Sequence, residues 1–251
     1  MADTLDVTID SLNAAGDGVA RAGGLRLIVP FTIPGERVRV RVGARRQNTA
    51  TARLIEVLTP SEHRIAPRCP HFGVDAKPGV GACGGCAWQH IAYPEQLRLK
   101  TALVERLVRT AVPAAPGVRA MQPSTPVDDP WGYRHKVHFV FGVASGVSRT
   151  RATSMAMGHY VRGTRRVIPV RECPVHDPRG NTLAFAFGEA CARAGVAGAD
   201  ARGRGVLRAI AIRVGCNTDE MMATLVVTSD ADRRLRTATR QAIEGAPEAP
   251  T

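Results

Sequence analysis

The first part of the chain alternates apolar and polar positions in short segments. Examples are Leu5–Asp10 and Arg37–Val42, and Gly- or Pro-containing turns separate such segments between residues 4 and 58. Alternation with a period of two is typical of strands that bury one face. Five short strands at this spacing predict a small OB-like β-barrel. In Arg37–Val42 the valines should point into the barrel and the arginines outward, because successive side chains of a strand point to opposite faces.

Later segments have a different periodicity. Residues 94–110 carry apolar side chains at helical spacing with charged residues opposite them, which predicts a packing helix that begins near Pro94. A Pro- and Ala-rich connection follows this helix. Two later segments are apolar enough to be buried strands in the centre of a sheet, residues 206–214 and 221–228. Further strands are expected at residues 137–143, 155–160 and 166–170, and helices at 181–194 and 231–243.

These elements predict an α+β fold, in which an N-terminal OB-like β-barrel precedes a mixed α/β central domain. Gly203–Gly205 precedes a predicted strand instead of following one, so we interpret it as a plain turn and not as a cofactor loop of the Rossmann type. The expected domains are the barrel at residues 1–60, a cysteine-rich loop and packing helix at 61–117, the α/β central domain at 118–230, and a helix with a tail at 231–251.

The composition adds a strong positive charge. Of the 251 residues, 34 are Lys or Arg and 22 are Asp or Glu, so the formal net charge is +12. We therefore expect an anionic partner, and favour nucleic acid over a membrane. The N-terminus lacks the basic start and apolar run of a secretory signal, and no segment approaches the ~20 apolar residues of a membrane span. The expected location is the cytoplasm.

Two groups of basic side chains are candidate RNA contacts. One lies on and just after the predicted strand at residues 37–42, where no acid interrupts the arginines, and the other lies on one face of the strand that follows Tyr133. An ordinary solvated strand face is the alternative in both cases, but the net charge favours phosphate contacts. The candidate residues are Arg37, Arg39, Arg41, Arg45, Arg46, Arg134, Lys136 and His138.

Three of the six cysteines lie close together in the sequence. Cys83 and Cys86 form a C-G-G-C tetrad, and Cys69 precedes them. The two glycines allow a tight turn that can direct both thiols toward one centre. In a cytoplasmic protein, clustered cysteines indicate a metal site more often than disulfides.

A site of this kind needs a fourth ligand from elsewhere in the chain. We favour Cys173, which lies in a polar turn between a predicted strand and a predicted helix. Cys191 lies in an Ala-rich helical segment, where a cysteine is usually a small apolar side chain, and Cys216 ends an apolar strand. From spacing alone, an iron–sulfur cluster and zinc are close to equally compatible, and His71 or His90 would complete a zinc site with three cysteines.

Several segments, taken in order, resemble the RNA uracil-C5 methyltransferases. The run CPHFGV…CGGCAWQHIAYPEQLRLK resembles the cluster-binding segment of that family. PGERVRVRV, with the following SEHRIAPRCPHFG, is similar to its TRAM domain, an OB-like RNA-binding barrel. YRHKV, from Tyr133, resembles a stretch of the central domain, and GHYVRGTRRVIPVRECPV resembles the segment with the fourth cluster cysteine. LRAIAIRVG and MMATLVVTS are similar to a later strand pair.

The resemblance implies a [4Fe–4S] cluster bound by Cys69, Cys83, Cys86 and Cys173, which would give the central domain an iron–sulfur loop. It also implies structured RNA as the partner, and ribosomal RNA is the kind that we favour. This sequence departs from the family pattern in the thirteen residues between Cys69 and Cys83, where residues 75–82 look like a looped-out insertion.

The family methylates uracil C5 with a cysteine nucleophile and S-adenosylmethionine, on a Rossmann-like domain that follows the central domain. We find no match to that domain before Thr251. We therefore expect no complete Rossmann-like methyltransferase domain and no catalytic residue in this chain. The expectation is a truncated and inactive enzyme, with S-adenosylmethionine bound only by an absent domain that could be separately encoded. The alternative is a non-catalytic RNA-binding protein with an iron–sulfur cluster or zinc.

Overall fold

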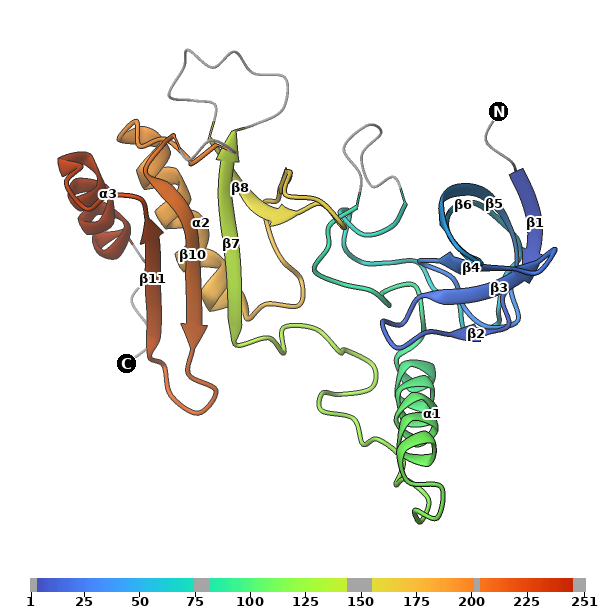
Figure 1. Cartoon of the computed structure of the whole chain (residues 1–251). Helices are drawn as coiled ribbons and strands as arrows, with labels where there is room; N and C mark the ends of the chain where they lie inside the picture. Colours follow the sequence, from blue (N-terminus) through green and yellow to red (C-terminus); the bar gives the residue numbers. More distant parts are fainter. Residues whose placement is uncertain (1–3, 75–81, 144–154, 201–203, 246–251) are drawn as a thin grey trace. The chain divides into compact units, whose positions relative to one another are not determined.

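The computed structural model describes residues 4–74, 82–143, 155–200 and 204–245. They belong to two compact units, each with its own sheet and hydrophobic core (Figure 1). The first unit comprises Met1–Ala76 and Cys86–Asp129, and the second comprises Lys77–Gly85 and Pro130–Thr251. None of the helices in the described part of the chain is long and apolar enough to cross a membrane.

A six-stranded sheet forms the barrel of the first unit, in the order β1-β5-β6-β4-β3-β2. All neighbouring strands are antiparallel except β4 and β6, which are parallel. The alternation along β5 has the consequence expected from the sequence, because Val38 and Val40 are fully buried in the core. The strands are β1 (Thr4–Thr8), β2 (Ser11–Leu12), β3 (Gly18–Ala22), β4 (Leu25–Val29), β5 (Arg37–Arg46) and β6 (Thr49–Thr59).

The helix α1 (Tyr93–Ala111) follows the barrel and has a proline in its first turn. Its first half packs through Leu99 against Ile91, Leu12 and Ile33, which form a small second core. The second half is less covered, since Leu107 is 51% exposed. The apolar packing of α1 is therefore concentrated in its first turns, and the second half contacts the barrel through Arg106 Nη2, which donates to the Leu12 carbonyl oxygen at 2.9 Å.

A buried ion pair ties the segment after the barrel to the barrel itself. The Glu36 carboxylate is fully buried, and it accepts hydrogen bonds from the backbone N–H groups of Ile33 and Ser61 and from the Arg64 guanidinium. The Arg64 Nη2 also donates to the Phe31 carbonyl oxygen at 2.9 Å. Burial alone would raise the pKa of Glu36, but Arg64 and the N–H donors outweigh it, and the pKa lies below its ordinary value.

The second unit contains a five-stranded sheet in the order β11-β10-β7-β8-β9. Every neighbouring pair is antiparallel, and two helices pack on one face of the sheet through a core that includes Phe139, Phe187 and Leu235 (Figure 1). The strands are β7 (Lys136–Val143), β8 (Met155–Tyr160), β9 (Val167–Pro169), β10 (Leu207–Val214) and β11 (Met221–Val227), and the helices are α2 (Pro178–Arg193) and α3 (Arg233–Glu244).

The sheets differ from the sequence prediction in two respects. The barrel has six strands instead of five, because the two-residue β2 is too short to give a pattern. The mixed α/β description of the central domain was wrong, because its sheet is antiparallel and the helices cover one face only. Consequently β11 is an edge strand whose side chains alternate between partial burial and exposure, and not a buried central strand.

Candidate nucleic-acid interface

Arg39 is held by acids on both neighbouring strands of the barrel. The register sets Asp6 of β1 and Glu56 of β6 opposite Arg39. Its Nε donates to Asp6 Oδ1 at 2.9 Å, and its Nη1 donates to Glu56 Oε2 at 2.9 Å. These contacts occupy donors that a phosphate would need. The sequence of β5 contains no acid, so it gave no sign of these partners.

Three other arginines form a continuous row across the outer wall of the barrel. Arg21 lies opposite Arg26, Arg26 lies opposite Thr49, and Thr49 lies opposite Arg46. We call Arg21, Arg26 and Arg46 the arginine row. All three side chains are exposed, and within the described residues none of them forms an ion pair. Arg21 and Arg26 repel each other because they lie opposite on adjacent strands, and Arg46 adds a third positive charge beyond Thr49, so the row favours a bound anion.

The sequence identified only Arg46 of this row. Arg21 and Arg26 lie in separate short strands, each with an ordinary alternating pattern, and only the β3–β4 register brings them together. The pattern also fixes their direction, because Ala20 and Leu27 are fully buried and their neighbours must face outward. The sequence signal that could have identified this pair is a predicted hairpin whose two strands each carry one outward arginine.

The remaining predicted arginines of β5 lie on the outer wall and near its hairpin. Arg37 is exposed, with its Nη2 3.9 Å from Asp6 Oδ2. Arg41 is exposed and lies opposite Arg53 of β6. Arg45 donates from Nε to the Gln47 carbonyl oxygen at 3.0 Å, within the turn between β5 and β6. These residues stay predicted RNA contacts.

The predicted strip of the second unit begins on β7. Lys136 and His138 are exposed and share one face of the strand, since Val137 and Phe139 between them are buried. Arg134 precedes the strand, and its backbone pairs with the segment before α2 through a bridge to His176. The structure therefore separates Arg134 from the regular part of the strip.

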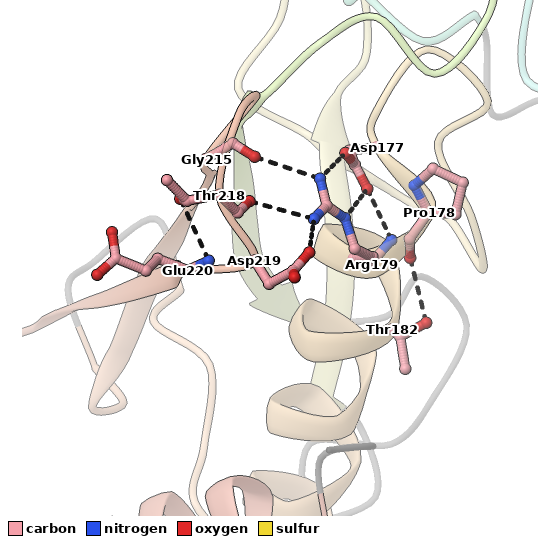
Figure 2. Close-up of polar contacts among 8 residues, drawn as sticks. All are labelled: Asp177, Pro178, Arg179, Thr182, Gly215, Thr218, Asp219 and Glu220. Carbon is pink, nitrogen blue, oxygen red and sulfur yellow. Dashed lines mark hydrogen bonds and ion pairs between the residues drawn. The ribbon is translucent and has the colours of Figure 1, made fainter. Parts of the chain in front are cut away.

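One arginine anchors the loop between β10 and β11. Arg179, in the first turn of α2, donates to the Asp177 carboxylate, to Asp219 Oδ1 at 3.2 Å, and to the carbonyl oxygens of Gly215 and Thr218 (Figure 2). Asp177 also caps α2 by accepting from the Arg179 backbone N–H at 2.9 Å. These contacts fix the loop at the end of the two strands and so support the surface that the strands present.

His176 is a buried histidine beside this cap. Burial lowers its pKa, although the hydrogen bond to Asn181 acts in the opposite direction. Its Nε2 faces the close-packed Gly180, where a Cβ atom would come within 2.5 Å of it. His176 is thus a packed side chain whose Nε2 is buried against Gly180.

The four predicted cluster cysteines are divided between the two units. Cys69 and Cys86 belong to the first unit, and Cys83 and Cys173 belong to the second. All four are partly exposed, and the Cys83 Sγ accepts a hydrogen bond from the Gly85 N–H at 3.4 Å. The proposed insertion at residues 75–82 falls, except for Ala82, outside the described residues.

The metal prediction finds no support in this arrangement. Among the described residues, no group of three or more His, Cys, Asp or Glu side chains could hold a metal ion. The alternative ligand His90 stacks on Phe72 at a ring-centroid distance of 5.6 Å, and burial lowers its pKa to about 4. Cys191 is buried, as its helical context suggested, and burial raises the pKa of its thiol to about 11. Neither unit by itself fits a four-cysteine cluster.

Comparisons with known proteins point to one class of enzyme. Residues 5–62 match the TRAM domain of tRNA (uracil(54)-C(5))-methyltransferase. An uncharacterized RNA methyltransferase of Thermosynechococcus vestitus is 32% identical over 89% of this chain and 46% of its own length. A 23S rRNA (uracil(1939)-C(5))-methyltransferase of Alkalilimnicola ehrlichii is 33% identical over 70% of this chain and 36% of its own length.

A solved structure has the same fold. The tRNA (uracil-54, C5)-methyltransferase of Pyrococcus abyssi, in complex with S-adenosyl-L-homocysteine, matches 94% of this chain and 48% of its own chain, with a TM-score of 0.68 and 20% identity. The chain thus spans about half the length of the curated relatives that it matches.

These findings correct the expected fold class and the expectation of a truncated, inactive enzyme. Nearly the whole chain, 94% of it, has the fold of a protein that was solved as a methyltransferase, and 89% of it aligns with an RNA methyltransferase. The sheet-rich architecture is therefore the fold of about half of that solved methyltransferase, and the expected fold class, which set this chain apart from a methyltransferase fold, was wrong. The error came from inferring a lost domain and lost activity from the position of the last residue, which supports neither conclusion.

Proposed function

Since this chain is a relative of the RNA uracil-C5 methyltransferases, we propose that it acts in the methylation of uracil C5 in RNA. The resemblance seen in the sequence is confirmed by the TRAM-domain match over residues 5–62 and by the curated relatives. In this reaction a methyl group replaces the hydrogen on C5, and the proton leaves to solvent. We assign the methyl transfer itself to no side chain of the described residues.

The arginine row is the observation that carries the proposal. A TRAM-type barrel that contacts RNA needs an outer surface whose positive charge is not neutralised by its own acids. Arg21, Arg26 and Arg46 meet this condition, whereas Arg39 is occupied by Asp6 and Glu56. Guanidinium groups suit phosphates because they donate two parallel hydrogen bonds. The row is thus the part of the barrel best suited to the RNA backbone.

The cofactor of the proposed reaction is S-adenosylmethionine. The Pyrococcus abyssi enzyme was solved with S-adenosyl-L-homocysteine, the product that remains after the methyl group has left. S-adenosylmethionine would supply the electrophilic methyl group, and the present chain would contribute RNA binding through its basic surfaces. Ribosomal RNA is the substrate that we favour, in line with the Alkalilimnicola ehrlichii relative.

A methylation assay tests the proposal. The purified protein is incubated with S-adenosylmethionine and with transcripts of 23S rRNA and tRNA, and nucleosides are then identified by mass spectrometry. We expect 5-methyluridine in the ribosomal transcript and its loss in a variant that replaces the arginine row with glutamine. Binding of RNA without any 5-methyluridine would instead favour a non-catalytic RNA-binding protein. Methylation of tRNA alone would refute the ribosomal preference.

The [4Fe–4S] cluster on Cys69, Cys83, Cys86 and Cys173 rests on the sequence resemblance, because the described residues do not form such a site. If the cluster exists, anaerobically purified protein contains about four iron atoms and about four sulfides per chain. Cys83→Ser should then abolish the iron content and the visible absorbance. Cys216→Ser is the matched control, because Cys216 is exposed and lies outside the predicted ligand set. Protein without iron, or with one zinc, would refute the cluster.

A further inference from the structure

The uncovered face of the sheet in the second unit has a charged end and an apolar end. We propose that this face binds a single-stranded segment of the RNA, with a phosphate between Lys136 and Arg213 and a base against His138 and Ala211. The inference rests on the proposed RNA function and names the form of RNA that this surface takes. Neighbouring strands build the face in three rows, which are Lys136–Arg213–Met222, His138–Ala211–Thr224 and Val140–Ala209–Val226.

The burial pattern shows that this face is open. The residues between the rows, such as Phe139, Ile210 and Ile212, are fully buried in the core that α2 and α3 cover. The residues of the rows point the other way, and Met222 and Val226 at the edge strand are 52% and 45% exposed. Arg179 and its partners hold the β10–β11 loop, so the end of the sheet that carries Arg213 is well fixed (Figure 2).

The charged end is a pair of like charges. Lys136 lies directly opposite Arg213 in the β7–β10 register, and both side chains are exposed. Neither forms an ion pair with any acid that the structure describes. Two cations on adjacent strands repel each other, and an anion between them removes the repulsion. A phosphate is the anion that an RNA-binding protein meets, and the guanidinium of Arg213 can bind it through two hydrogen bonds.

The middle row suits a nucleobase. Ala211 is small and lies between His138 and Thr224, so no bulky side chain covers the sheet there. The exposed imidazole of His138 can stack on a base, as histidine does in proteins that read single-stranded RNA. Met222, on the neighbouring row, offers a flexible apolar contact.

These features favour single-stranded over double-stranded RNA. In a duplex the bases are stacked inside, so a duplex would contact Lys136 and Arg213 through its backbone and leave the apolar rows exposed to water. An unpaired base can leave its stack and lie on the sheet while the adjacent phosphate reaches the charged row. A protein partner could use Met222 and Val226, but it would leave the like-charged pair unneutralised unless it carried acids there.

The test compares two double variants of the second unit. Lys136→Gln with Arg213→Gln removes the charged row, and Arg236→Gln with Arg240→Gln removes two exposed charges of α3, which packs on the opposite face. Affinities for a short oligouridine and for a hairpin duplex are measured over a range of salt. We expect the first variant to lose roughly tenfold in oligouridine affinity and its salt slope to fall by about 0.7, the value for one single-strand phosphate contact. The α3 variant should change little.

The base contact has a separate readout. His138→Ala should weaken oligouridine binding about fivefold or more, and His138→Phe should restore it, because both imidazole and benzene rings stack on bases. Equal losses in the two double variants would overturn the proposal, as would equal loss for the duplex. The proposal would also be overturned if Met222→Ser changed the oligomeric state and left oligouridine binding intact, because the face would then contact a protein partner. Failure of the methylation assay with oligouridine binding retained would refute the proposed function and leave this inference standing.

Discussion

Replacing Arg64 with alanine is expected to lower the free energy of unfolding of the first unit by about 3–5 kcal/mol. The Glu36 carboxylate is fully buried, and two of its hydrogen bonds come from the Arg64 guanidinium. Without Arg64, a buried negative charge keeps only the N–H donors of Ile33 and Ser61. The Phe31 carbonyl would also lose its donor. Chemical denaturation followed by circular dichroism measures the change.

Arg39→Ala is the matched control for this experiment. Like Arg64→Ala, it removes a paired arginine. The Arg39 side chain binds two carboxylates but is 41% exposed, so the loss of unfolding free energy should stay below about 1 kcal/mol. The double variant Arg64→Met with Glu36→Gln should be more stable than Arg64→Ala alone, because it removes the unpaired charge. Equal losses in Arg39→Ala and Arg64→Ala would contradict the role assigned to the buried pair.

Glu36 also gives this stability a pH dependence. Its pKa lies below the ordinary value of 4.5, because Arg64 and the backbone donors outweigh the effect of burial. A carboxyl with a lowered pKa contributes stability above its unfolded pKa and loses that contribution as the pH falls through the folded pKa. The stability difference between the wild type and Glu36→Gln should therefore shrink below about pH 4.5.

Replacing the arginine row with glutamine is expected to weaken RNA binding about a hundredfold at 0.1 M salt. Each phosphate contact contributes about 0.7–0.9 to the slope of log affinity against log salt, so three contacts remove about 2–2.7. Arg21, Arg26 and Arg46 are exposed on three strands of the same wall, and within the described residues no acid balances them. Fluorescence anisotropy with a ribosomal RNA fragment over a salt series measures both quantities.

Arg39→Gln serves as the comparison, because Arg39 lies on the same wall and its donors are taken by Asp6 and Glu56. We expect this variant to change RNA affinity less than threefold, since the Arg39 guanidinium that it removes has no donor available for a phosphate. If Arg39→Gln lowered RNA affinity as much as the arginine-row variant does, Arg39 would contact RNA despite its ion pairs with Asp6 and Glu56.

The sequence predicted the elements better than it predicted their neighbours. The helix expected from Pro94 and the strands around Val38 and Phe139 follow from periodicity, because a buried face imposes its repeat on the chain. The edge position of β11 could not be read in this way. Its apolar residues suggested two covered faces, whereas Met222 and Val226 lie on an open one.

The same limit applies to the candidate site. Arg39 looked available because no acid stands beside it in the sequence, but its partners Asp6 and Glu56 come from other strands. Arg21 and Arg26 did not stand out in the sequence, because each lies alone in its strand and only the pairing of β3 with β4 brings them together. The cysteines Cys83 and Cys86 gave a clear spacing, but spacing carries no information about whether ligands from two units meet. The sequence of each segment therefore predicted the chemistry of its side chains, but it did not predict which segments pair.

The arginine row has a further consequence, since its members come from β3, β4 and β5, and Arg46 joins Arg21 and Arg26 of the β3–β4 hairpin only when β6 pairs with β4 and β5. In the unfolded chain Arg46 is not held near Arg21 and Arg26, so the three guanidinium groups do not form one binding surface. A polyanion that bridges them thus binds the folded barrel selectively and stabilises it by mass action, by about 2.7 kcal/mol at a hundred times its dissociation constant. RNA would act on this protein as a folding ligand as well as a substrate.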